Sequence, residues 1–267
     1  MNNKVYDTDQ DDEKINKIRN NTTEASNVFV VFFTPRSGSS WLTDICEQSK
    51  ILSRPDECFN PNFTPEMTRA FGARNLTEYV ECLKRRRNTY GTFGCQLTYY
   101  QLSATFGSEE RFMDYFHGSN FFWLTRKDIV SQAVSLAKMV STSITHAPAH
   151  DQIEIDKSDA SYEYNRADIR KWADHIRNAE RATEMLFEKY LINPHRMYYE
   201  DITRAGSDAT IELIADKIGV SKTTHGGVKS KHRKISTPKN IEYAERFLKE
   251  ETEFVNKIYE DRQRYLK

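Results

Sequence analysis

The sequence predicts an α/β protein with a central parallel sheet flanked by helices, on the basis of three observations. The run Val28 to Phe33 is a continuous stretch of β-branched and aromatic residues, which is typical of a strand buried on both faces of a sheet. Apolar residues follow it at helical spacing, at Leu42, Ile45 and Cys46. Residues 120–125 repeat the arrangement, with a buried apolar run followed by a second helical pattern. Because parallel neighbours need a long crossover connection, alternating strands and helices indicate a parallel sheet.

Each remaining element has its own local signal. Phe93, Cys95 and Leu97 alternate with other residues, which predicts a strand over 92–97. Apolar positions recur every three or four residues from 169 to 190, as in a long amphipathic helix, and Asn193-Pro194 ends it. The other predicted elements are a helix that begins near Leu76, a short strand over 196–199, a helix over 208–218 capped by Ser207, and a last helix that begins at Thr237-Pro238.

Composition divides the chain into a polar start and one domain. The chain has 267 residues and a mass of 31.2 kDa, within the range of a single large domain. Residues 1–26 are polar with few apolar positions, so we expect a mobile N-terminal tail. No internal repeat or change of composition follows, so residues 27–267 are predicted to form one domain. The sequence leaves the oligomeric state open, and a homodimer is one arrangement that it allows.

Charge and apolar patterning exclude several classes of protein. Lys and Arg number 39, as do Asp and Glu, so the net charge is zero and the sequence pI is about 7.1. A protein that coats nucleic acid or an anionic membrane is expected to be basic. The longest apolar run, 28–33, is far too short to span a bilayer, and residues 1–25 lack the apolar stretch of a signal peptide. The four cysteines show no paired short spacing, which favours buried free thiols in a reducing, cytoplasmic compartment.

The segment between the first predicted strand and its helix carries the strongest functional signal. It reads T-P-R-S-G-S-S-W over residues 34–41. A helix N-terminus presents backbone N–H groups to an anion, Gly38 can adopt a positive φ, and Arg36 adds donors suited to phosphate or sulfate oxygens. The spacings of a Walker A loop, a nucleophile elbow and a dinucleotide-binding loop are all absent. The predicted anion-binding residues are Arg36, Ser37, Gly38, Ser39, Ser40 and Trp41.

Two further segments add positive charge. Arg126 follows the buried run 120–125, at the carboxyl end of a parallel strand, where it could hold a second phosphate of the same ligand. Residues 221–241 contain lysine, arginine and histidine but no acidic residue. This stretch includes Lys231 and Arg233, and we interpret it either as a solvated loop or as a flap that closes on a polyanionic nucleotide. The histidines are scattered without i, i+4 pairing, so no metal site is expected.

In order and spacing, these motifs resemble a known family. The T-P-R-S-G-S-S-W-L segment resembles the 5′-phosphosulfate loop of sulfotransferases that use 3′-phosphoadenosine 5′-phosphosulfate (PAPS). Its arginine, in place of the lysine of the cytosolic members, and the R-P-D-E-C-F that starts at Arg54 resemble the bacterial trehalose 2-sulfotransferase-like branch. Further matching segments are F-G-C-Q-L (93–97), R-K-D (126–128), Q-A-V-S (132–135) and Y-Y-E-D-I (198–202). The resemblance spans about residues 28–240 and implies a P-loop-NTPase-like sulfotransferase fold.

The resemblance implies a reaction and a role for each matching residue. Residues 36–40 would hold the 5′-phosphosulfate of PAPS, the co-substrate, and Arg126 and Ser135 would hold its 3′-phosphate. Glu57 would be the general base that takes the proton from a hydroxyl of a carbohydrate or glycolipid acceptor. Arg36 would stabilise charge on the departing phosphate during in-line transfer. These residues require no metal.

Two departures from the family and two alternative functions remain open. Gln96 stands where the family has a lysine, which puts a substrate or phosphate contact there in doubt. The interval from Arg126 to Ser135 is one residue longer than in the cytosolic branch, so Ser131 is a rival ligand for the 3′-phosphate.

A kinase-like phosphotransferase is disfavoured by the missing phosphate-bridging lysine and the lack of an evident Mg²⁺-holding acid. A non-catalytic nucleotide- or anion-binding module would bind the nucleotide without turnover of any acceptor. The expected partner is a small-molecule or saccharide hydroxyl acceptor, with no nucleic acid and no transmembrane segment.

Overall fold

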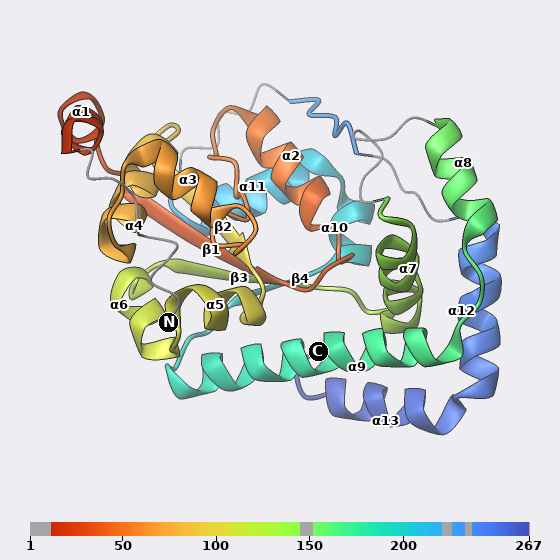
Figure 1. The fold of residues 1–267 in the computed structure, drawn as a ribbon. Coiled ribbons are helices and arrows are strands. Elements are labelled where there is room, and N and C mark those ends of the chain that lie inside the picture. Colours follow the sequence, from red (N-terminus) through yellow and green to blue (C-terminus); the bar gives the residue numbers. More distant parts are fainter. Residues whose placement is uncertain (1–11, 145–151, 221–225, 233–236, 267) are drawn as a thin grey trace.

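The computed structural model of the chain describes residues 12–144, 152–220, 226–232 and 237–266. Its centre is a sheet with the strands β1 (Asn27–Phe33), β2 (Thr92–Leu97), β3 (Asn120–Thr125) and β4 (His195–Tyr198) in the spatial order β2-β1-β3-β4 (Figure 1). All neighbouring strands run parallel. The predicted α/β fold with a central parallel sheet is therefore confirmed.

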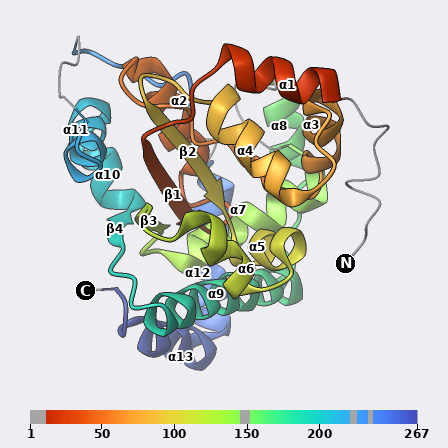
Figure 2. The same cartoon turned by 90° about the vertical axis from the view of Figure 1, so that its left-hand side faces the viewer.

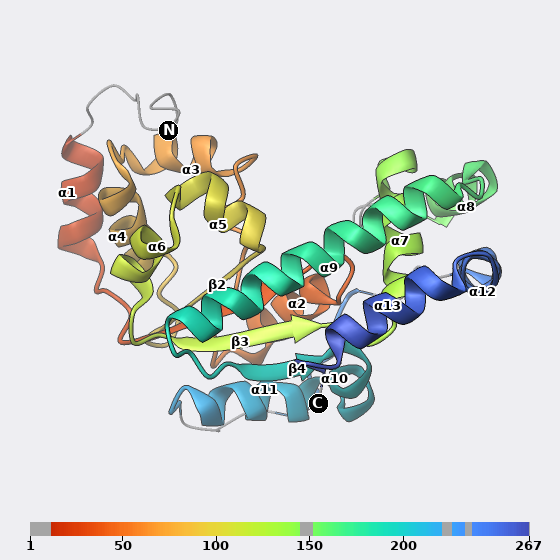
Figure 3. The same ribbon diagram turned by 90° about the horizontal axis from the view of Figure 1, so that it is seen from below.

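The strands are apolar because helices cover both faces of the sheet. Val30 and Phe32 of β1 belong to one apolar cluster, and Phe29 and Val31 belong to the other, as the two-residue period of a strand requires. The first cluster packs against α4 (Leu76–Arg86), α5 (Tyr99–Phe106), α6 (Glu109–Phe116) and α9 (Arg166–Lys189). The second packs against α2 (Ser39–Ser49), α10 (Tyr199–Ala205) and α11 (Ser207–Lys217). Figure 3 shows α9 and α11 on opposite sides of the sheet.

The remaining helices extend the molecule beyond the sheet. A third apolar cluster joins α9 to α7 (Ile129–Thr142), α12 (Pro238–Glu250) and α13 (Thr252–Arg262). The helix α8 (Gln152–Ser161) packs against α7, and α3 (Thr64–Phe71) packs against α4. Figure 2 shows α3 and α4 at the opposite end of the sheet region from α11. No helix in the described ranges is both long and apolar enough to span a bilayer.

Three boundaries differ from those expected. The last predicted helix is in fact two helices, α12 and α13, separated at Glu251, whose φ and ψ of −127° and 35° are not helical. Ser207 is the first residue of α11 and not its cap, because Gly206 takes the cap position and no side chain accepts a bond there. The strand predicted over 196–199 is β4, which begins and ends one residue earlier.

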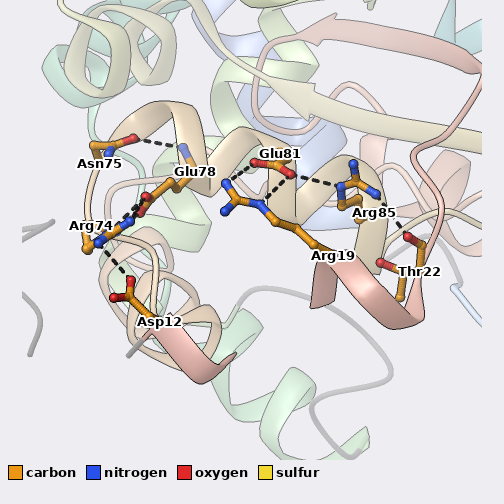
Figure 4. A network of polar contacts seen from close by, with 8 residues as sticks. All are labelled: Asp12, Arg19, Thr22, Arg74, Asn75, Glu78, Glu81 and Arg85. Atoms are coloured by element: carbon orange, nitrogen blue, oxygen red, sulfur yellow. Dashed lines mark hydrogen bonds and ion pairs between the residues drawn. The ribbon is translucent and has the colours of Figure 1, made fainter. Parts of the chain in front are cut away.

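Part of the segment predicted as a mobile tail forms the helix α1 (Asp12–Asn21). Its Ile15 and Ile18 are buried, and α1 packs against α3 and α4. Arg19 donates two hydrogen bonds to the carboxylate of Glu81, at 3.0 and 2.7 Å, within the polar network of Figure 4. The structure differs from the expectation because two isoleucines one turn apart bury one face of an otherwise polar helix. Residues 1–11 lie outside the described range.

The strand order brings the predicted anion-binding segments together. From β1 the chain crosses to β2 on one side of it, and it later returns to β3 on the other side. In open α/β sheets, ligands bind outside the carboxyl ends of the strands where the direction of crossing changes. Residues 34–38 leave β1 at this point, and Arg126 follows β3 beside it. The fold thus places both segments at one edge of the sheet.

Candidate active site

The loop between β1 and α2 is a tight turn with two left-handed residues. Arg36 has a φ of 67° and Gly38 a φ of 91°, and the N–H of Ser37 donates to the carbonyl of Thr34 at 3.2 Å. The helix α2 begins at Ser39 with Gly38 at its cap position. Because the first turn of a helix directs its N–H groups out of the helix end, this loop offers the anion-binding arrangement predicted for it.

Tyr199 packs against this loop and also against Arg126. A Cβ atom added to Gly38 would lie 2.5 Å from Cδ2 of the Tyr199 ring, so only glycine fits under the ring. The guanidinium of Arg126 lies over the same ring, 5.1 Å from its centre. One aromatic side chain from the start of α10 therefore supports both predicted anion-binding segments.

Arg36 and Arg126 bring two like charges close together in a largely buried place. The Nε of Arg36 donates to Oγ of Ser135 at 3.0 Å. Burial and the nearby charge of Arg126 lower the pKa of Arg36. Of the two rival serines on α7, Ser135 is the one that contacts Arg36, while the N–H of Ser131 donates to the side chain of Asp128, which caps α7. Two adjacent cations in a buried place are most stable with an anion between them.

Two buried donors in this place fit an anionic ligand. Oγ of Ser37 and Nε of Arg126 are buried and have no hydrogen-bond partner among the described residues. The nearest carboxylate oxygen to Nε of Arg126, on Glu200, is 3.8 Å away, which is beyond hydrogen-bonding distance. Buried polar atoms are nearly always bonded, so orphaned donors at a predicted anion site indicate a ligand. These donors suit the oxygens of a phosphate or sulfate.

Gln132, which the sequence placed only within a matching motif, fixes the position of the loop. Its fully buried amide Nε2 donates to Oγ1 of Thr34 at 2.9 Å and to the carbonyl of Pro35 at 2.8 Å. Gln132 belongs to α7, the helix that also carries Ser135. Its amide therefore holds the loop after β1 against the helix after β3.

A cavity of about 350 Å³ lies next to the anion-binding loop. It contains the predicted base Glu57 together with Ser40 of the loop and with Gln96 of β2. Oε2 of Glu57 accepts hydrogen bonds from Asn60 at 2.9 Å and from Gln101 at 2.7 Å. The residues that line the cavity are Ser40, Thr43, Asp44, Glu47, Arg54, Asp56, Glu57, Phe63, Gln96, Lys231 and His232.

Residues 226–232, which belong to the predicted flap 221–241, are held by two carboxylates. Asp208 accepts from the N–H groups of Gly227 and Val228, at 2.8 and 3.1 Å. Asp44 of α2 accepts from Oγ of Ser230 at 2.7 Å and from the N–H of Lys231 at 2.6 Å. These bonds place Lys231 at the cavity.

The hydrogen bonds to Asp44 also set its charge state. Burial by itself raises the pKa of Asp44, but the bonds from Ser230, Gln48 and the Lys231 N–H outweigh it and hold this pKa below its ordinary value. Asp44 is therefore ionised at neutral pH and anchors the segment. Arg233 lies outside the described residues.

The surroundings of Trp41 and Gln96, two other residues singled out in the sequence, differ from those of the loop donors. Trp41 is half-buried and packs against the apolar cluster between α2 and the sheet. Gln96 is buried, and its Oε1 has no hydrogen-bond partner in the described part of the chain. No group of three or more His, Cys, Asp or Glu side chains that could hold a metal ion occurs among the described residues.

A parallel α/β sheet with a tight loop and a helix N-terminus after β1, and with arginines converging at its switch point, is typical of a protein that binds the anionic groups of a ligand. A family model, the Stf0 sulphotransferase family, matches residues 80–250. The chain belongs to this family and is a sulfotransferase. The matched range includes Arg126, Gln132 and Ser135, and the loop and Glu57 precede it. A search of curated proteins found no match.

Proposed function

We propose that this sulfotransferase moves a sulfuryl group from PAPS to a hydroxyl of a carbohydrate or glycolipid acceptor, with Glu57 as the general base. The observation that carries the proposal is the shared cavity, in which Glu57 lies together with Ser40 of the anion-binding loop. A base and a donor-binding loop on one cavity can hold the acceptor hydroxyl and the sulfuryl group at reacting distance.

The donor is assigned to PAPS because two separate groups of cationic and hydroxyl donors meet at the switch point. Residues 36–40 and the N-terminus of α2 suit the 5′-phosphosulfate. Arg126, whose buried Nε has no partner in the described ranges, suits the 3′-phosphate. Ser135 joins the two groups through its bond to Arg36. When bound, PAPS supplies an activated sulfuryl group whose leaving group is a phosphate.

The acid–base work falls to Glu57. Its Oε2 is held by the amides of Asn60 and Gln101, which orient the carboxylate, so Oε1 is the atom that takes the acceptor proton. Arg36 and the N–H groups of the loop stabilise the charge that grows on the departing phosphate. Lys231, which lines the same cavity, adds a further positive charge.

The walls of the cavity fit a polyhydroxylated acceptor. Arg54 pairs with Glu47 at 3.2 Å and with Asp56 at 2.6 Å, and all three line the cavity. The carboxylates can accept hydrogen bonds from hydroxyls, and the guanidinium can donate hydrogen bonds to them. Phe63, with 53% of its surface exposed, adds an aromatic face against which the C–H face of a sugar ring can pack.

The test is a sulfation assay with the full chain, a panel of mono- and disaccharides, and product detection by mass spectrometry. Adenosine 5′-phosphosulfate, which lacks the 3′-phosphate, serves as the matched donor control. We expect a sulfated saccharide with PAPS and at most trace product with the control donor. Binding of PAPS without turnover of any hydroxyl would support a non-catalytic module instead. Phosphate transfer from ATP would support a kinase-like reaction.

A further inference from the structure

Arg262, the last residue of α13, is fully buried behind the turn that carries Arg126. Its Nη2 donates to the backbone carbonyl of Arg126 at 2.6 Å, and its Nη1 donates to that of Lys127 at 2.9 Å. Its side chain has an exposure of 0%. The two bonds fix two consecutive carbonyls of the turn after β3 from a helix that begins more than a hundred residues later in the chain.

The charge of Arg262 is neutralised within the same buried group. Its Nε and Nη2 donate to the two carboxylate oxygens of Glu180, at 2.8 and 3.0 Å, and Glu180 is also 0% exposed. The hydroxyl of Tyr265 donates to Glu180 at 2.9 Å. Because a buried bidentate pair has little freedom to move, Arg262 is a rigid support.

The N–H groups of the same turn are held by the carboxylate of Glu200. Glu200 of α10 accepts from the N–H groups of Lys127 and Asp128, at 3.0 and 3.2 Å. The backbone of the turn therefore has its carbonyls bound by Arg262 and its N–H groups bound by Glu200. The guanidinium of Arg126, by contrast, rests on the Tyr199 ring and lies 3.8 Å from Glu200. Its direction therefore depends on the backbone from which it projects, together with the Tyr199 ring on which it rests.

We propose that Arg262 is a positioning residue that aims Arg126 at the 3′-phosphate of the donor and so determines the preference for a 3′-phosphorylated nucleotide. This inference rests on the proposed function, because it takes Arg126 to be the ligand of the 3′-phosphate. It assigns a role in donor binding to a residue of α13, a helix that lies beyond the range of the family match.

The experiment compares two ligands that differ only in the 3′-phosphate. Calorimetric titration of the full chain with adenosine 3′,5′-bisphosphate and with AMP gives the ratio of the two dissociation constants. Removing Arg262 alone leaves Glu180 as an unpaired buried charge, so the main variant is the double substitution Glu180→Leu with Arg262→Met, which removes the pair together. Arg262→Lys keeps the charge opposite Glu180 but lacks the two-sided fork of donors.

Asp261→Asn is the matched control, because it removes the other ion pair between α9 and α13, Arg177–Asp261 at 3.3 Å, without touching the turn. We expect the double variant to lower the preference for the bisphosphate by about tenfold or more, with AMP affinity changed by less than about twofold. Arg262→Lys should give an intermediate preference, and Asp261→Asn should retain the wild-type value.

Arg126→Ala, measured in parallel, distinguishes the role of Arg262 from the assignment of Arg126 to the 3′-phosphate. If Arg126→Ala lowers the preference but the double variant, with a native circular dichroism spectrum, does not, the role of Arg262 is overturned while the proposed function stands. If Arg126→Ala leaves the preference unchanged, the assignment of the 3′-phosphate is overturned and the role of Arg262 with it. A preference that falls in both variants and not in the control supports the inference.

Discussion

The Nε of Arg36 lies 3.0 Å from Oγ of Ser135, a residue 99 positions later in the chain. This bond joins the loop after β1 to the helix after β3, across the switch point of the sheet. It also fixes the plane of the Arg36 guanidinium, because Nε has a single hydrogen and therefore a single direction of donation. The donor site is thus assembled from two segments whose relative position depends on the completed sheet.

Replacing Ser135 by alanine should weaken nucleotide binding. The substitution removes the hydroxyl that holds Arg36, and the loss of one hydrogen bond to a charged group corresponds to about a 10- to 150-fold weaker affinity for adenosine 3′,5′-bisphosphate. Ser131→Ala, one turn earlier on α7, is the matched control and should change affinity by less than about twofold. Calorimetric titration measures both. A larger effect at Ser131 would make that serine the ligand and contradict the assignment.

Replacing Gly38 by alanine should disrupt the anion-binding loop. The new Cβ would lie 2.5 Å from the Tyr199 ring, at a φ of 91° that L-residues rarely adopt. We expect bisphosphate affinity to fall by about tenfold or more, since Tyr199 must move and Arg126 lies on its ring. Gly118→Ala is the control, because Gly118 also has a positive φ, of 79°, but a Cβ there meets nothing within 4 Å. Equal binding in the two variants would show that neither the contact with Tyr199 nor the strain at Gly38 matters for holding the nucleotide.

Replacing Glu57 by glutamine should slow turnover without weakening the binding of the donor. The substitution keeps the shape of the side chain and removes the proton acceptor, so kcat should fall by about 10²- to 10⁴-fold. Affinity for adenosine 3′,5′-bisphosphate should stay within about twofold of that of the wild type. Glu47→Gln changes another carboxylate of the same cavity, one assigned to acceptor binding, so it should raise the KM for the acceptor and leave kcat within about threefold of the wild-type value. Wild-type kcat in Glu57→Gln would remove Glu57 from the role of base.

The elements that sequence patterns predict well are those whose signal is local. The strands β1 and β3 are continuous apolar runs because both of their faces are covered, and α9 shows its apolar stripe because one side faces solvent. Arg36 and Gly38 carry a local signal too, since the backbone N–H groups of a loop between a buried strand and a helix can bind an anion.

The supports of the site could not be predicted in this way. Gln132 reaches Pro35 across 97 residues, and Arg262 reaches Arg126 across 136. Each contact exists only once the sheet has formed, and nothing in the neighbouring sequence of either residue marks it. A polar residue in a helix is usually solvated, so the composition of α7 and α13 gives no sign that these two side chains are fully buried.

The helix α1 allows a test of how the N-terminal segment is held. Ile15 is 1% exposed, so Ile15→Ala should lower the free energy of unfolding by about 2 to 4 kcal/mol. Arg19→Ala removes a pair whose partners are 40% and 24% exposed, and solvent screening limits its effect to below about 1 kcal/mol. Urea denaturation of both variants measures the difference. If Ile15→Ala costs no more than Arg19→Ala, α1 does not pack against α4 in solution.

The stability of the chain should fall as the pH drops below neutrality, in part through His232. Burial, helped by the charge of Arg54 and opposed by that of Asp44, lowers the pKa of His232. A histidine whose pKa is lower in the folded state contributes stability above its unfolded pKa of about 6.5, and this contribution is lost as the pH falls toward the folded pKa. His232→Gln should therefore lose less Tm than the wild type between about pH 7.5 and about pH 5, a range that brackets the unfolded pKa of histidine.

The exposed His117 provides the control for this pH series. His117→Gln makes the same change of side chain at an exposed position away from the cavity, so it measures the effect of replacing a histidine by glutamine as such. His175 and His195, whose pKa values are also lowered by burial, remain in both variants, so a residual slope is expected in each. The difference between the slopes of His232→Gln and His117→Gln is the part that belongs to His232. Identical slopes would mean that His232 is solvated when the chain is folded, and that residues 226–232 do not stay closed over the cavity.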